Sequence, residues 1–285
     1  MSPREARRPV PATPPSRVAT RKGKPRDREL EVGSSAHYED PAYYTKTYKR
    51  RLEDVRFYVG VALERGTPTL EYGCGNGRIT IPIAREGGVV AGVDLSKPML
   101  DDLARRLADE PDDVRARVTH KRGDMRAVKL GRRFDRVLLP FNALLHLYSR
   151  DDVERFCARV REHLTPRGEL VFDVSVPEPT ELARDPDKPH FAPRFRYPDG
   201  GDGSIVRYSE RFDYDRLRQV LFVSMEFHPI DGRPTWVTPM THRQFYPQEL
   251  EALLHYNGLE VVSCDGDFYG TKPDPRSASM LVYRC

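Results

Sequence analysis

A glycine-rich turn between a short strand and a helix constrains this chain more than any other feature. Thr69–Glu71 is expected to form the strand and Ile79–Arg85 the helix, and Gly73, Gly75 and Gly77 alternate with other residues between them. Glycine adopts positive φ angles and lets a ligand approach the backbone closely. Because open α/β sheets bind ligands at the carboxyl ends of their strands, this turn predicts a ligand site.

Two kinds of ligand compete for such a turn. A dinucleotide fingerprint, G-x-G-x-x-G, needs a third glycine or an alanine for helix packing, but Arg78 or Thr80 stands at that position here. Glu71 lies two residues before Gly73, and a carboxylate at that point repels a pyrophosphate. The turn therefore favours a ligand that carries a cationic amine and a sulfonium.

The segments after the turn alternate between strand and helix patterns. Apolar runs predict buried strands, and apolar residues at helical spacing predict helices, one of them capped by Ser96 with Pro98 in its first turn. This order predicts an α/β fold with a parallel sheet that has helices on both faces. The expected strands include 89–93, 118–122, 134–139, 169–174, 259–264 and 278–283, and the expected helices are 40–64, 96–107, 151–164 and 248–256.

Further motifs stand where these strands end. Asp94 follows the strand 89–93, Asp124 follows 118–122, and Leu139–Asn142 closes 134–139. With the acid-x-Gly-x-Gly-x-Gly run at Glu71, these motifs resemble the ordered motifs of the class I S-adenosylmethionine-dependent methyltransferases. The resemblance extends over about residues 36–285. Within this family, the chain is similar to the small-molecule enzymes of the glycine and amino-sugar N-methyltransferase type.

This resemblance implies a fold, a cofactor and its contacts. It implies a Rossmann-like sheet of seven strands whose last strand is antiparallel, and S-adenosyl-L-methionine as the cofactor. Glu71 would face the cofactor's cationic groups, Asp94 the ribose hydroxyls and Asp124 the adenine amino group. The residues expected to bind the cofactor are Glu71, Gly73, Cys74, Gly75, Gly77, Arg78, Asp94, Leu95, Met99, Asp124, Met125, Pro140, Phe141, Asn142 and Tyr48.

The net charge of +4 belongs to the amino-terminal tail. Residues 1–31 hold nine Lys and Arg against four acids, which leaves a net charge of −1 for residues 32–285. Six prolines and few large apolar residues predict that 1–33 is a disordered basic tail. A nearly neutral remainder argues against a nucleic-acid-binding domain.

Residues 34–66 are expected to form lid helices over the cofactor. Four tyrosines between residues 38 and 48 offer aromatic faces to a sulfonium, and Tyr44 is the candidate for a catalytic role in guiding it. The alternative is that Tyr44 and Tyr48, one helical turn apart, only pack on the core.

His146 is the candidate general base, because it follows the Leu139–Asn142 motif by one helical turn. The alternative is a partly buried histidine without a catalytic role. No clustered ligand spacing or disulfide framework is present, so the sequence predicts no metal and reduced cysteines.

A long segment interrupts the alternation. Residues 67–176 and 246–285 are expected to form the cofactor-binding core, and 177–245 an antiparallel β insertion that covers the substrate. Three strands are expected within it, 205–212, 218–227 and 235–244, and Arg and aromatic residues alternate along them, which predicts one face that presents both. The substrate-binding candidates are Arg207, Trp236, Arg243 and, before the last strand, Tyr269. The alternative is an ordinary solvent-exposed strand face.

The sequence therefore predicts a methyltransferase that acts on N or O of a small-molecule metabolite. Two alternatives remain: methylation of RNA or protein with help from the basic tail, and a cofactor-binding scaffold without catalysis. A cytoplasmic monomer or homodimer without membrane contact is expected, with nucleic acid an improbable partner.

Overall fold

The computed structural model describes residues 27–66, 68–198 and 203–285. Its main sheet has seven strands in the order β10-β11-β5-β4-β1-β2-β3. The pairs among β1 to β5 are parallel, and β11 runs antiparallel to both of its neighbours. The strands are β1 Thr69–Tyr72, β2 Val90–Asp94, β3 Val118–Arg122, β4 Phe134–Leu139, β5 Leu164–Ser175, β10 Ser263–Asp265 and β11 Met280–Arg284. The expected seven-stranded sheet with an antiparallel last strand is confirmed.

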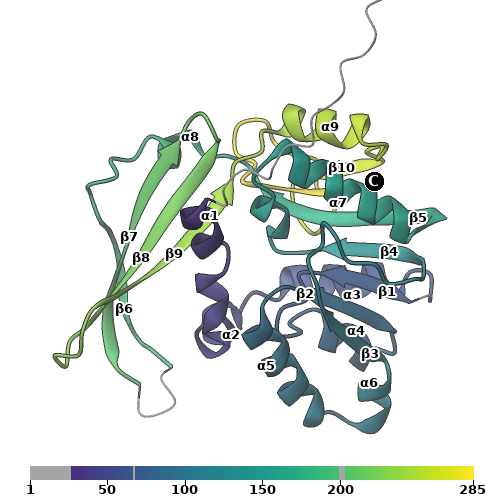
Figure 1. The fold of residues 1–285 in the computed structure, drawn as a ribbon, viewed down its shortest axis with the longest axis horizontal. Helices are drawn as coiled ribbons and strands as arrows, with labels where there is room; N and C mark the ends of the chain where they lie inside the picture. The colour runs from purple at the N-terminus through teal and green to yellow at the C-terminus, as the bar shows by residue number, and fades with distance from the viewer. Residues whose placement is uncertain (1–26, 67, 199–202) are drawn as a thin grey trace, which may run out of the picture.

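Helices cover both faces of this sheet (Figure 1). The helices α3 and α4 share an apolar cluster with one face, and α5 packs beside α4. On the other face, α7 and α9 enclose a second cluster with the strands. The bounds are α3 Glu53–Leu63, α4 Thr80–Arg85, α5 Lys97–Ala108, α6 Asp112–Ala116, α7 Arg150–His163 and α9 Pro247–Tyr256, with the short 3-10 helix η2 at Ala143–His146. Strands buried on both faces need the near-continuous apolar runs that the sequence has.

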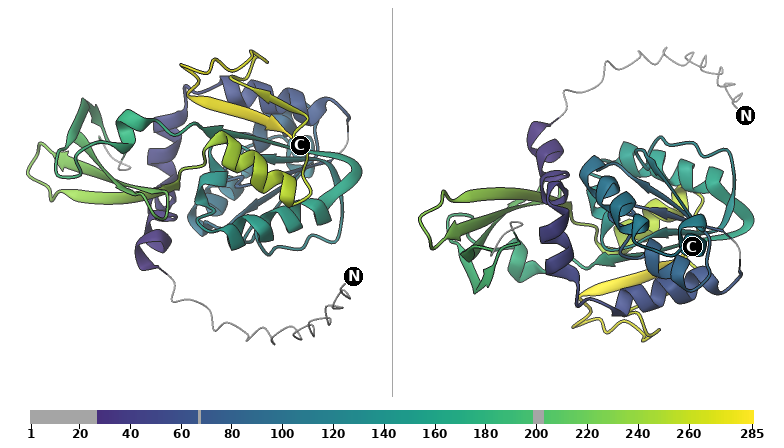
Figure 2. Two further views of the ribbon diagram at one scale, coloured as in Figure 1. Left: turned by 90° about the horizontal axis from the view of Figure 1, so that it is seen from above. Right: turned by 90° about the horizontal axis from the view of Figure 1, so that it is seen from below.

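The insertion is a separate four-stranded antiparallel sheet in the order β6-β7-β8-β9. Figures 1 and 2 show it standing beside the core rather than extending the main sheet. Its elements are α8 Pro179–Leu182, β6 His190–Arg196, β7 Ile205–Asp215, β8 Val220–Pro229 and β9 Trp236–Arg243. Three of the strands were expected, but β6 was not, because its segment is rich in proline and charge and its side chains are almost all exposed.

The amino-terminal helices lie between the core and the insertion (Figure 1). They are α1 Arg28–Gly33, the 3-10 helix η1 Ala36–Glu39 and α2 Pro41–Tyr48. Two expectations are corrected here. Residues 28–33 are helical rather than disordered, because Gly33 is buried against Thr241 of β9. The expected helix 40–64 breaks at 49–52, where Leu52 is 47% exposed. Residues 1–26 lie outside the described part.

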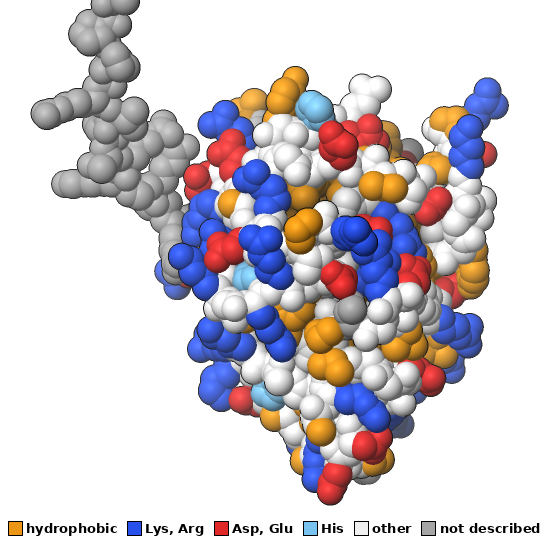
Figure 3. Space-filling model, turned by 90° about the vertical axis from the view of Figure 1, so that its right-hand side faces the viewer, with side chains coloured by type: hydrophobic (Ala, Val, Ile, Leu, Met, Phe, Trp, Pro, Cys, Tyr) orange, Lys and Arg blue, Asp and Glu red, His pale blue; other side chains and the backbone are white. Residues whose placement is uncertain are grey.

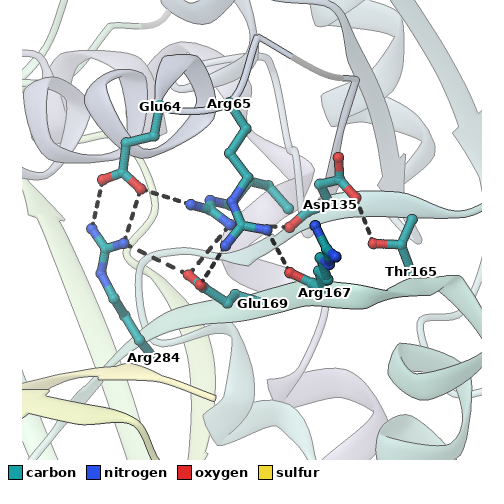
Figure 4. A network of polar contacts seen from close by, with 8 residues as sticks. Glu64, Arg65, Asp135, Thr165, Arg167, Glu169 and Arg284 are labelled. Atoms are coloured by element: carbon teal, nitrogen blue, oxygen red, sulfur yellow. Dashed lines mark hydrogen bonds and ion pairs between the residues drawn. The ribbon is translucent and has the colours of Figure 1, made fainter.

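Ion pairs join neighbouring strands to α3 at the end of the sheet that lies opposite the glycine turn (Figure 4). Arg136 on β4 is only 3% exposed, and its guanidinium lies 2.8 Å from Glu64 and 3.3 Å from Glu169. Arg284 on β11 binds both oxygens of Glu64 at 2.9 and 3.0 Å. This network joins α3, β4, β5 and β11. All four cysteines are free, and no helix of the described residues is long and apolar enough to cross a bilayer.

We expect Glu64→Gln to destabilise the fold in a pH-dependent way. Hydrogen bonds from Arg284 and Arg136 lower the pKa of Glu64. The stabilisation that ionised Glu64 gives to the fold is therefore present at pH values above its ordinary pKa. It is lost as the pH falls through the lowered pKa. Near neutral pH the melting temperature should fall by about 2–4 °C, and the difference should vanish in acid. Thermal unfolding by circular dichroism checks this, with the exposed Glu260→Gln as control; a loss that persists in acid would contradict it.

Candidate active site

The glycine turn has the backbone geometry of a ligand cradle. Gly73, Gly75 and Gly77 have φ angles of +66°, +52° and +83°, which L side chains rarely adopt. A Cβ on Gly77 would lie 2.4 Å from Leu103 Cδ1, and one on Gly75 would lie 3.1 Å from Met99 Cε. Gly73 and Gly75 expose their backbone, whereas Gly77 is buried. The first two glycines are thus open to a ligand, and the third serves helix packing.

Two carboxylates lie beneath this turn and form no ion pair with a described residue. Glu71 is 2% exposed, and the Thr80 hydroxyl donates to it at 2.5 Å. Burial raises the pKa of Glu71 to about 8. Asp94 accepts from the backbone N–H of Gly75 and of Ser96, both at 2.7 Å, and burial raises its pKa as well. A buried carboxylate without an ion pair is costly, so this site fits a cationic ligand such as S-adenosylmethionine.

The other candidates around the turn differ in how accessible they are. Leu95 is 57% exposed, next to Asp94, whereas Met99 is buried under Gly75. The side chain of Cys74 is buried in the cluster with α5. Met125 is half-buried against the core.

Asp124 is already paired. Partial burial would raise its pKa, but hydrogen bonds from Arg126 at 2.7 to 3.1 Å lower it. Arg126 also contacts Asp152 at 2.5 Å. The sequence did not predict this pairing, and an adenine amino group would have to share Asp124 with Arg126.

The turn after β4 is strained and held by β5. Phe141 and Asn142, which follow the buried Pro140, both have a φ of +60°, and each left-handed non-glycine residue costs roughly 1–2 kcal/mol. Phe141 N–H and the Tyr58 hydroxyl both donate to Asp173 Oδ1 at 2.7 Å. The Asn142 side chain bonds to Ser175. Strain of this kind persists only where its surroundings enforce it, and it is typical of functional sites.

The ring of Phe141 lies against two guanidinium groups. Arg51 and Arg78 each lie 4.7 Å from its centroid. Both also bind the fully buried Asp54, Arg78 with two hydrogen bonds of 2.9 and 2.6 Å. Tyr48 packs on the same ring at 4.8 Å. The amino-terminal helices, the glycine turn and the β4 turn therefore meet at Phe141.

A cluster of neutral tyrosines and histidines lies above this point. Tyr44 and Tyr48 pack with ring centroids 4.8 Å apart, and burial raises the pKa of Tyr44 to about 12. The Tyr38 hydroxyl lies 2.8 Å from His146 Nε2, and the Tyr148 hydroxyl lies 3.1 Å from His146 Nδ1. The predicted residues Tyr44, Tyr48 and His146 thus share one cluster.

His242 of the insertion joins this cluster. Its ring centroid is 5.2 Å from that of His146. Burial lowers the pKa of His146 to about 4 and that of His242 to about 3, and each is lowered further by a neighbouring histidine. Both imidazoles are therefore neutral near pH 7. His146 has two hydroxyl partners, whereas the His242 ring has no hydrogen bond to any described residue.

The insertion sheet separates the predicted substrate residues. Tyr208 pairs with Phe227, which pairs with Trp236, while Arg207 pairs with the next residue, His228. Neighbouring positions on a strand point to opposite faces. Arg207 and Arg243 therefore do not share a face with Trp236, although Phe191 and Phe222 lie on the same face as Arg207. Trp236 and His242 lie on the face toward the core, and Arg207 and Arg243 lie on the other.

Two of these candidates have other surroundings. Arg243 is largely buried, and its guanidinium donates to Tyr148 O, Gln219 and Glu249. Tyr269 is 71% exposed in a loop whose Phe268 packs on Phe57 and Tyr58. The structure does not bring Arg207, Arg243 or Tyr269 together with His146.

Sequence patterns missed several residues of the site. Asp173 carried a usable signal, an acid within an otherwise apolar strand. His37 and Tyr148 carried none, because they approach the site only through the fold of the amino-terminal segment and the turn after β4.

Comparison with known proteins agrees with this geometry. A model of a family described as "Methyltransferase domain" matches residues 69–168. A cypemycin N-terminal methyltransferase from Streptomyces sp is 27% identical over 76% of this chain and 82% of its own length. A dTDP-3-amino-3,4,6-trideoxy-alpha-D-glucopyranose N,N-dimethyltransferase from Streptomyces venezuelae is 30% identical over 45% of this chain and 51% of its own length. The structure of the CcbJ methyltransferase from Streptomyces caelestis superposes with a TM-score of 0.70 at 26% identity and covers 87% of this chain and 96% of that one.

We expect Glu71→Gln to stabilise the ligand-free protein at high pH. The raised pKa means that Glu71 makes the fold less stable as pH rises from its ordinary value to about 8. Glutamine removes this cost of a few kcal/mol, at about 1.4 kcal/mol per pKa unit, and can still accept from Thr80. Urea unfolding near pH 5 and near pH 8 checks this, with the exposed Glu86→Gln as control. A variant less stable than wild type at the higher pH would refute the assignment.

We expect Asp173→Leu to lower the free energy of unfolding by about 2–5 kcal/mol. It leaves Phe141 N–H and the Tyr58 hydroxyl without an acceptor, at roughly 1–3 kcal/mol each. Asp173→Asn is the matched control, because its carbonyl oxygen can accept both bonds. Chemical denaturation measures the difference, and equal stability of the two variants would show that the β4 turn does not depend on this acceptor.

Proposed function

Because this chain is a class I S-adenosylmethionine-dependent methyltransferase, we propose that it transfers the methyl group to an amino nitrogen of a small hydrophilic molecule. The observation that carries the proposal is the pair of half-buried, neutral imidazoles of His146 and His242 at the junction of core and insertion. An amino nitrogen presents N–H groups that need a hydrogen-bond acceptor, and a neutral imidazole can be one.

The residues around the glycine turn would hold the cofactor. Glu71 and Asp94 would face its cationic groups and ribose, and Leu95 would pack on its base. S-adenosylmethionine supplies an electrophilic methyl carbon: the C–N bond forms as the C–S bond breaks, and the electron pair of that bond leaves with a neutral thioether. The rings of Tyr44, Tyr48 and Phe141 would guide the sulfonium by cation–π attraction, without a fixed counter-charge that would favour the ground state.

The cluster would also select the protonation state of the substrate. The burial that lowers the pKa of His146 and His242 lowers the pKa of an ammonium ion in the same place. A neutral amine, which has the lone pair needed for attack, is therefore favoured over its ammonium form. After transfer, the methylated ammonium can donate a hydrogen bond to the His242 ring, because both ring nitrogens of His146 already bond to the hydroxyls of Tyr38 and Tyr148, and its extra proton leaves to solvent.

The relatives support nitrogen as the acceptor. Two of the three proteins reported above are named for N-terminal methylation of cypemycin and for N,N-dimethylation of a dTDP-3-amino sugar. A small substrate also suits the surface, because basic and acidic side chains are interspersed over the face shown in Figure 3.

A methyl-transfer assay with labelled S-adenosylmethionine tests the function. Amino sugars, amino-terminal peptides and matched hydroxyl analogues should separate nitrogen from oxygen acceptors, and Gly75→Val should abolish cofactor binding. Transfer only to RNA or protein, lost on deletion of residues 1–26, would replace the small-molecule proposal. Cofactor binding without transfer to any acceptor would favour a scaffold.

We expect Glu71→Gln to weaken S-adenosylmethionine binding about 10-fold or more, although the same change stabilises the empty protein, because the cofactor loses a carboxylate next to its cationic groups. Isothermal titration calorimetry near pH 8 measures this. Unchanged affinity would show that Glu71 serves only the fold.

We expect His146→Gln and His242→Gln each to lower kcat by about 10²-fold while the affinity for S-adenosylmethionine stays unchanged. The loss should shrink as pH rises, since more of the substrate then arrives as the free amine. Steady-state kinetics across pH check this, with the exposed His255→Gln on α9 as control. Full activity of both variants would remove the imidazole pair from the mechanism.

A further inference from the structure

A basic hollow lies outside the glycine turn, where α2 and the start of α3 face α4 and α5. Its volume is about 210 Å³. Five of its lining residues are cationic and none is acidic. The cations are Lys49, Arg51, Arg78, Arg85 and Arg106.

Two of these cations form no ion pair with a described residue, although the charge of Arg106 also acts on Glu110. Arg51 and Arg78 share Asp54, and Arg85 pairs with Glu110. Arg106 donates only to a neutral acceptor, the backbone oxygen of Asn76, at 3.0 Å. Lys49 forms no ion pair with a described residue. The hollow therefore has two positive charges without an ion pair to a described residue, one directly after α2 and one on α5.

The cofactor's own cationic groups do not suit this hollow. The carboxylates that fit them, Glu71 and Asp94, lie beneath the turn, while Arg78 is directed toward Asp54 and the Phe141 ring. Tyr44, Asn76 and Arg78 line the hollow at the turn. Like charges would repel a sulfonium or an ammonium here, whereas an oxyanion would be attracted.

We propose that this hollow binds a phosphoryl-type oxyanion at the same time as the cofactor. Its oxygens would accept from Lys49 Nζ and from the Arg106 guanidinium, as arginine and lysine commonly bind phosphate. The bound anion would connect α2 to α5 by a charged bridge that the protein alone does not have.

This bridge would couple the anion to the cofactor. α2 contributes Tyr44 and Tyr48 to the cluster above the turn, and α5 contributes Met99 beneath Gly75. An anion that holds α2 on α5 should therefore slow the loss of the cofactor, and by reciprocity the cofactor should strengthen anion binding.

The test uses the full chain and inorganic phosphate as the probe, with sodium chloride at equal ionic strength as the reference. Phosphate should raise the melting temperature beyond chloride and lower the Kd for S-adenosylmethionine several-fold in calorimetry. Both effects should disappear in Lys49→Gln and Arg106→Gln, while the exposed control Lys97→Gln retains them. A phosphomonoester should act like phosphate if the phosphoryl group alone is recognised.

Three results would overturn the proposal. Phosphate could act no differently from chloride, which would make the hollow an ordinary solvated surface. Its effect could survive both substitutions, which would place the anion elsewhere. Phosphate could raise the Kd for S-adenosylmethionine, which would assign the hollow to the carboxylate of the cofactor. None of these readouts needs catalysis, so a failure of the proposed amine methylation is distinguishable from a failure of this site.

Discussion

The hydrogen bond between Phe141 N–H and Asp173 is the contact on which the rest of the site depends. It holds a bulky residue in a left-handed conformation at the end of β4, and the neighbouring Asn142 has the same conformation. The Phe141 ring then becomes the point where Arg51, Arg78 and Tyr48 converge. The strained turn thus fixes the point at which the amino-terminal helices, the glycine turn and the β4 turn meet.

The cluster around His146 and His242 consists of uncharged groups, whereas the carboxylates Glu71 and Asp94 lie beneath the glycine turn. His146 and His242 are neutral because burial opposes their protonation, as does the nearby His37 for both rings and His146 for His242. Glu71 and Asp94 accept from backbone and hydroxyl donors but form no ion pair with a described residue. This division matches a reaction between a positively charged methyl donor and a nucleophile that must arrive uncharged.

Much of the core could be predicted from sequence because its signals are local. The glycine turn, β2 and the Ser96-capped α5 appear where apolar runs, turn residues and caps place them. The insertion could be predicted only in part. The alternation of side chains identified β7, β8 and β9. The face that each residue occupies depends on the pairing register, which the sequence does not reveal. For this reason Arg207 and Trp236 were wrongly placed on one face. His242 could not be identified because its partner lies on a distant element.

The position of α2 has a consequence for how ligands are exchanged. Tyr38, just before α2, bonds to His146 of the core, while Asp40 accepts from Tyr197, which follows β6 of the insertion, and Lys46 donates to Arg196 O. Any outward movement of this segment breaks contacts on both sides at once. A single opening therefore uncovers donor and acceptor sites together, which favours departure of the product along with the spent donor after each round. An acceptor that receives two methyl groups would then have to rebind between the two transfers.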